Sequence, residues 1–127
     1  MSFELFFQKG RTSSEVVTLY EANGNGLTLY SGDKVRFKVY RRDAATPVLD
    51  IDSVGALSGG SLVTVDQIAS AAQVTLKMCQ GDTSGLTAGA YDAELTVVDS
   101  GDSNLIKTVE TGLVHFLPSP GGDIGLT

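Results

Sequence analysis

The sequence predicts an all-β domain, because short segments in which apolar and polar residues alternate are separated by turn residues. Fifteen glycines are spread from one end of the 127-residue chain to the other. The clearest segment is Lys34–Arg41, where Val35, Phe37 and Val39 are expected to face one side of a sheet. A chain of this length buries about two-thirds of its unfolded surface in a single domain.

The first third of the chain predicts two strands and a turn. Ser2–Gln8 is an apolar run interrupted by Glu4, so it indicates an opening strand rather than a signal peptide, and it is too short to span a bilayer. Glu15–Tyr20 is the next expected strand. Asn23–Gly26 follows as a turn, because asparagine and glycine tolerate positive φ. Without a signal, we expect synthesis in a cytoplasm.

The middle of the chain predicts an edge strand and a hairpin. Pro47 precedes the short strand Val48–Ile51, and proline in that position indicates a strand start or a sheet edge. Leu62–Val65 and Gln73–Cys79 are expected to pair as a hairpin, with the apolar residues of the second strand facing inward. Residues 66–72 between them fit either a loop or one helical turn.

The most informative motif is Leu86-x-x-Gly89-x-Tyr91, since it leads directly into the alternating strand Tyr91–Val97. In Greek-key sandwiches, a tyrosine after a tight glycine-containing turn packs its ring in the core, and its hydroxyl bonds back to nearby backbone. We therefore assign structural roles to Leu86, Gly89 and Tyr91. The motif predicts an immunoglobulin-like Greek-key β-sandwich of about seven to nine short strands.

Two further strands are expected to complete the sandwich, which then covers residues 1–117. They are Asn104–Thr111 and Leu113–Leu117, and their apolar positions change phase across Gly112. A glycine at such a change of phase predicts a β-bulge that separates the two strands.

The segment that follows, residues 118–127, predicts an extended C-terminal tail. It is rich in proline and glycine, which favour neither a helix nor a central strand. Ile124 and Leu126 are its apolar side chains, so they are the candidate residues for contact with a partner.

The single histidine and the fifteen carboxylates form no recognisable catalytic site. His115 lies between Val114 and Phe116, so its side chain is expected to point away from the core. No Gly-x-Ser-x-Gly motif supplies a nucleophile beside it. A glycosidase needs two carboxylates across a cleft, and a lone small sandwich has little room for one. We expect no catalytic residue and no enzymatic activity.

Two features of the sequence could suggest a metal site, and both have a simpler structural explanation. Asp99-x-x-Asp102-x-Asn104 offers three oxygen side chains but lacks the spacing and the final glutamate of an EF-hand. The same residues favour a hairpin turn, so calcium binding by Asp99–Asn104 stays an open question. Cys79 is the only cysteine, which excludes an internal disulfide and a cysteine-based zinc cluster. We expect no metal site and no cofactor.

The net charge of −6 argues against nucleic acid as a partner, because phosphate binding needs clustered lysine and arginine. One basic cluster exists, Arg36-x-Lys38-x-x-Arg41-Arg42, and its first two members lie on the outer side of a strand. It predicts a solvated face or salt links to acidic neighbours. A membrane partner is not expected either.

Together these segments resemble the small immunoglobulin-like domains of tailed-bacteriophage structural proteins, including those of upper baseplate proteins and other virion accessories. The resemblance covers nearly the whole chain. It rests on Gly32-Asp33, Val35-x-Phe37-x-Val39, Pro47, Leu86-x-x-Gly89-x-Tyr91-x-x-x-Leu95-x-Val97-x-Asp99 and Gly112-x-Val114-x-Phe116-x-Pro118.

The resemblance implies a non-enzymatic structural component of a bacteriophage virion, either a capsid decoration protein or a tail or baseplate accessory, assembled in the host cytoplasm. Its partners would be other virion proteins and further copies of itself. The alternative is a carbohydrate- or host-surface-binding module, which requires an exposed aromatic cluster such as Tyr20, Tyr30 and Tyr40.

Overall fold

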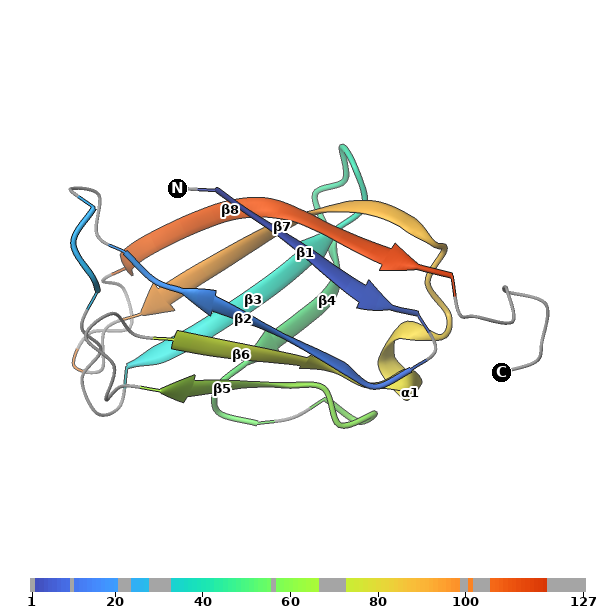
Figure 1. Cartoon of the computed structure of the whole chain (residues 1–127), viewed down its shortest axis with the longest axis horizontal. Helices are drawn as coiled ribbons and strands as arrows, with labels where there is room; N and C mark the ends of the chain where they lie inside the picture. The colour runs from blue at the N-terminus through green and yellow to red at the C-terminus, as the bar shows by residue number, and fades with distance from the viewer. Residues whose placement is uncertain are drawn as a thin grey trace.

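The computed structural model describes residues 2–9, 11–20, 24–27, 33–55, 57–66, 73–98, 101 and 106–118. Within these residues, eight strands form two sheets that pack face to face, so the protein is an all-β sandwich (Figure 1). The elements are β1 (Ser2–Gln8), β2 (Ser13–Thr18), β3 (Lys34–Tyr40), β4 (Pro47–Asp52), β5 (Leu62–Asp66), β6 (Gln73–Met78), α1 (Gln80–Thr83), β7 (Gly89–Val98) and β8 (Ile106–Leu117).

The larger sheet has five strands in the order β1-β8-β7-β3-β4, and the smaller has three in the order β2-β6-β5. β1 runs parallel to β8, whereas every other pair of neighbouring strands is antiparallel. The chain changes sheet after β1, after β2, after β4 and after β6. Each crossing brings segments that are distant in sequence against the same core (Figure 1).

The core forms because inward-facing residues alternate with outward-facing ones along each strand. In β3, Val35, Phe37 and Val39 are fully buried, which confirms the predicted alternation. The predicted inward residues of β6 are also fully buried. Among the described residues, the largest side chains that are fully or almost fully buried come from both sheets and the adjoining chain: Phe7, Leu19, Val35, Phe37, Val39, Ile51, Val74, Leu76, Met78, Leu95, Val97 and Phe116.

Two local predictions for the middle of the chain are confirmed. β4 begins at Pro47 and lies at an edge of the five-stranded sheet, where a missing N–H costs no ladder hydrogen bond. β5 and β6 pair as antiparallel neighbours, with Val63 opposite Leu76. For residues 66–72, the sequence fitted either a loop or one helical turn. Asp66 is the last residue of β5, and residues 67–72 lie outside the described part of the chain.

The predicted break at Gly112 is wrong, because β8 is one continuous strand. Gly112 stays in register between Phe3 and Ala93, and the register shift lies instead between Val97 and Val98. A Cβ at position 112 would overlap the backbone oxygen of Phe3 and come within 2.6 Å of its ring. The glycine therefore allows a close approach of β1.

The change of phase has a different origin. Glu110 shares the inner side of β8 with Val114 and Phe116, and it is buried although it is acidic. An inward-facing glutamate and an inward-facing glycine hide the alternation that a continuous strand would otherwise show.

The helix α1 was not predicted. It forms one turn between β6 and β7 and begins directly after Cys79. The sequence pattern before it indicates only a strand that ends at Cys79. Four residues give too short a stretch for a helical period of apolar positions to appear.

Replacing Gly112 with alanine is expected to lower the free energy of unfolding by about 1–3 kcal/mol, because the new methyl group must displace the backbone of β1. Urea denaturation measures the change. Gly85→Ala is the matched control, since a Cβ there meets nothing within 4 Å. Equal denaturation midpoints for the two variants would contradict the close approach.

Candidate functional site

The tyrosine motif forms a corner at the start of β7. The hydroxyl of Tyr91 donates a 2.6 Å hydrogen bond to the backbone oxygen of Thr87, and its ring is 4% exposed. The ring packs edge-on against Phe116, with 5.3 Å between the centroids. Gly89 has a φ of 142°, which an L side chain rarely adopts. Leu86 is partly buried and packs against the core.

A second tie joins the loop before β5 to α1. The carboxylate of Asp82 accepts hydrogen bonds of 3.0 Å from the backbone N–H groups of Gly59 and Ser61. Burial alone would raise the pKa of Asp82, but the hydrogen bonds from Ser61 and Gly59 outweigh it and lower the pKa. The hydroxyl of Ser61 accepts from the N–H of Cys79, which is buried as expected for a structural residue.

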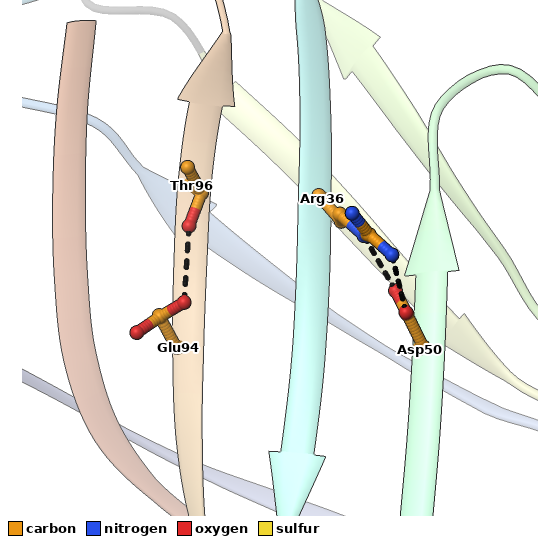
Figure 2. Close-up of polar contacts among 4 residues, drawn as sticks. All are labelled: Arg36, Asp50, Glu94 and Thr96. Atoms are coloured by element: carbon orange, nitrogen blue, oxygen red, sulfur yellow. Dashed lines mark hydrogen bonds and ion pairs between the residues drawn. The ribbon is translucent and has the colours of Figure 1, made fainter. Parts of the chain in front are cut away.

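The outer face of the five-stranded sheet carries the charges of the chain's basic cluster. Arg36 on β3 donates to both carboxylate oxygens of Asp50 on β4, at 2.8 and 2.6 Å (Figure 2). This pair raises the pKa of Arg36 and lowers the pKa of Asp50 through the hydrogen bond between them. Arg42 forms a 3.2 Å ion pair with Asp92. The predicted salt links to acidic neighbours are confirmed.

Acidic and basic residues alternate from strand to strand across this face. Lys38 on β3 lies between Asp50 on β4 and Glu94 on β7 in the pairing register. Glu94 also accepts a 3.4 Å hydrogen bond from the hydroxyl of Thr96 along the same strand (Figure 2). The face is therefore internally compensated, and each exposed ion pair adds only about 0–1 kcal/mol to stability.

The β1–β8 side of the same face carries an aromatic contact. The ring of Phe6 stacks on the imidazole of His115 with 4.7 Å between centroids, and His115 Nε2 lies 2.9 Å from Glu4 Oε2. His115 points away from the core, as predicted. Phe6 is 48% exposed and Leu117 is 44% exposed, so two large apolar side chains meet solvent on adjacent strands.

The contacts of His115 were missed by sequence reasoning because they depend on the parallel pairing of β1 with β8. That pairing places residues more than a hundred positions apart opposite each other, and no local signal marks it. The neighbours of His115 are a carboxylate and an aromatic ring. Both contact the imidazole, and neither is the serine or cysteine that a catalytic triad uses as its nucleophile.

Two shallow hollows flank β7 on the outer face. One, of about 430 Å³, is lined by Tyr40, Asp92, Ala93, Glu94, Thr111, Gly112 and Leu113. The other, of about 480 Å³, lies at the tyrosine corner and is lined by Arg41, Arg42, Thr87, Ala88, Gly89, Ala90 and Tyr91. Ala90, a small residue that faces outward on β7, lies in the hollow at the tyrosine corner. Together with Phe6 and Leu117, the two hollows give a surface suited to contact with another protein.

Other predicted candidates are not brought together. Tyr20 continues from the three-stranded sheet through its bridge to Gly26, whereas Tyr40 ends β3 in the other sheet. Tyr30 lies outside the described residues. The proposed carbohydrate platform therefore has no pair of tyrosines on one described face.

The remaining motif residues are in segments that the structure does not describe. Asp99, Asp102 and Asn104 of the possible calcium turn belong to this group, as do Ile124 and Leu126 of the C-terminal tail. Of residues 118–127, only Pro118 is described, and its backbone oxygen accepts a 3.3 Å hydrogen bond from the side chain of Gln8.

The buried carboxyl group of Glu110 is a feature that the sequence analysis missed. Its side chain lies on the inner side of β8, the residue is 4% exposed, and Oε1 has no hydrogen-bond partner. Burial raises the pKa of Glu110, and a hydrogen bond from the Tyr20 backbone and the positive α-amino group offset this only in part. In the sequence, Glu110 lies an even number of residues before Val114 and Phe116, so the alternation of a continuous strand would have placed all three side chains on the same side.

Comparisons with known proteins add no family: no protein-family model matches the chain, and a search of curated proteins finds no match either.

Among the described residues, no group of three or more His, Cys, Asp or Glu side chains is placed to hold a metal ion. No helix in the described part of the chain is long and apolar enough to cross a membrane. The outer face of the five-stranded sheet is the candidate site because it combines the exposed Phe6 and Leu117 with two hollows.

Tyr91→Phe is expected to lower the free energy of unfolding by about 1 kcal/mol, because it removes the hydrogen bond to Thr87 and keeps the ring packing. Thermal or urea denaturation measures this loss. Tyr40→Phe removes a hydroxyl from the half-buried end of β3 and serves as the control. If both variants unfold like the parent protein, the corner hydrogen bond contributes nothing.

Glu110→Gln is expected to raise the free energy of unfolding at neutral pH by about 1–3 kcal/mol, because it removes a buried negative charge that its partners offset only in part. The folded protein binds this proton more tightly than the unfolded chain does. The bound proton therefore contributes to the stability of the folded protein. This contribution is fully present below the ordinary glutamate pKa of about 4.3, and it is lost as pH rises through the pKa of Glu110 in the folded protein.

The gain from Glu110→Gln should therefore shrink as pH falls towards 4, since wild-type Glu110 is then protonated too. Urea denaturation of both proteins across this pH range provides the test. Glu15→Gln removes the same charge from a half-buried position and reports the effect of net charge alone. A gain from Glu110→Gln that does not depend on pH would contradict a raised pKa.

Proposed function

We propose that the sandwich is of the immunoglobulin-like Greek-key type. Three features support this: the strand order of the two sheets, the parallel pairing of the first strand with the last, and the tyrosine corner at the start of β7. The connection from β6 to β7 crosses between the sheets and carries both α1 and the corner.

We propose that the chain is a non-enzymatic structural component of a bacteriophage virion, a capsid decoration protein or a tail or baseplate accessory that acts through protein–protein contacts. The main support for this proposal comes from the outer face of the five-stranded sheet. It combines the exposed Phe6 and Leu117 with hollows and internally compensated charges. Exposed apolar anchors within a polar surround are typical of a surface that binds protein.

The partners proposed for this face are other virion proteins, met during assembly in the host cytoplasm. A particle presents the same site many times, so a modest contact at each copy yields tight overall attachment. The compact sandwich supplies a surface whose backbone needs no ordering on binding, which limits the entropic cost of attachment.

The chain is expected to be found in purified phage particles at a fixed ratio to a major capsid or tail protein. Quantitative mass spectrometry of particles banded in a density gradient measures that ratio. Particles assembled with Phe6→Ser or Leu117→Ser should carry fewer copies, whereas Val54→Ser removes an exposed apolar side chain away from this face and is the control. Absence of the chain from banded particles would contradict a virion role.

A further inference from the structure

We propose that β5 is a docking edge, and that residues 123–127 of a second copy of this chain add to it as an extra strand. The inference rests on the proposed structural function and names the subunit contact that this function would use. The contact is head-to-tail, because the donor segment and the receiving edge are different surfaces.

The receiving edge is marked by a hollow that follows the strand. β5 pairs on one side with β6, and no other strand of the described chain pairs with its second side. A hollow of about 390 Å³ is lined by the consecutive residues 62–65 of β5, together with Asp33 and Ser53. Successive side chains of a strand point to opposite faces. A hollow that touches four in a row therefore runs along the edge of the strand.

The other sheet edges carry the features by which proteins prevent unwanted strand pairing. Charged side chains and proline are the usual devices. β1 carries the exposed Glu4, β2 carries Glu15 and lies beside β1, and β4 begins at Pro47 and carries Asp50. β5 has neither proline nor charge before its last residue, Asp66. By the residues of the edge strand itself, β5 is the least protected of the four described edges, and the charged group beside it is the buried carboxyl of Asp33 in the same hollow.

The donor segment fits this edge in length and in pattern. Residues 118–122 form a Pro/Gly-rich linker, and residues 123–127 read Asp-Ile-Gly-Leu-Thr, with apolar residues at alternate positions. β5 also spans five residues. In a parallel register, Ile124 pairs with Val63 and Leu126 with Val65, both on the inner side of the sheet. That register also keeps Asp123 at the opposite end from Asp66.

Reach favours a second copy over the same molecule. β8 and β5 belong to different sheets, and β8 lies three strand positions from β4, the sheet edge nearest β5 (Figure 1). Three strand spacings and one sheet spacing make a straight line through the core of about 17 Å. The chain makes six Cα–Cα steps from Leu117 to Asp123, which extend to at most about 22 Å. The route around the surface follows the three strand spacings and then the sheet spacing, so it is about 24 Å long. The segment therefore reaches an adjacent molecule more readily than its own β5.

Light scattering behind a sizing column tests the contact with full-length protein. The parent chain is expected to form species larger than a monomer. Ile124→Ser/Leu126→Ser and Thr64→Lys should each reduce the mass to that of a monomer, because they remove the donor side chains or place a charge on the receiving edge. Thr75→Lys adds the same charge on the central strand β6, directly opposite Thr64, and should leave assembly unchanged.

A synthetic peptide of residues 118–127, added at millimolar concentration to the Ile124→Ser/Leu126→Ser protein, detects a contact too weak for light scattering. Amide resonances of β5 should shift and those of β4 should not. A monomeric parent chain together with unshifted β5 resonances would overturn the proposal. So would assembly that survives Thr64→Lys, since the receiving edge would then lie elsewhere.

The occupant is tested separately from the edge. Assembly that survives Ile124→Ser/Leu126→Ser but is lost with Thr64→Lys would mean that two β5 edges pair directly, which overturns the role of residues 123–127. The particle assay is independent of both results. Absence from particles contradicts the virion function, whereas failure of assembly contradicts only strand addition.

Discussion

The packing of Phe7, Tyr91 and Phe116 between the sheets is the interaction on which the rest of the structure depends. These rings come from β1, β7 and β8, and all are at most 4% exposed. Burying large aromatic side chains supplies much of the hydrophobic free energy of a small domain. The Tyr91 hydroxyl also ties the β6–β7 connection to the core through Thr87.

The outer face of the five-stranded sheet follows from this packing. Once Phe7 and Phe116 face inward, strand alternation turns Phe6, His115 and Leu117 outward. Their exposure is thus the other half of the pattern that builds the core. The charges on β3, β4 and β7 are set outward by the same rule, and pairs such as Arg36–Asp50 compensate them locally.

The strand β8 shows where the fold accepts a local cost. Its inner side holds Gly112, which admits β1, and Glu110, whose buried oxygen lacks a partner. Neither residue suits a core position by its own chemistry. The neighbouring Val114 and Phe116 are fully or almost fully buried, and their packing outweighs the cost of ordering this strand.

The sequence by itself determined the all-β class, the seven strands β1 to β7 to within a few residues, and the inward residues of β3 and β6. These properties depend on local alternation and on turn residues, which a short stretch of chain displays in full. The tertiary structure decided the continuity of β8, the burial of Glu110 and the contacts of His115. Each depends on which strand lies beside which, and the free energy of that choice is shared among residues far apart in the chain.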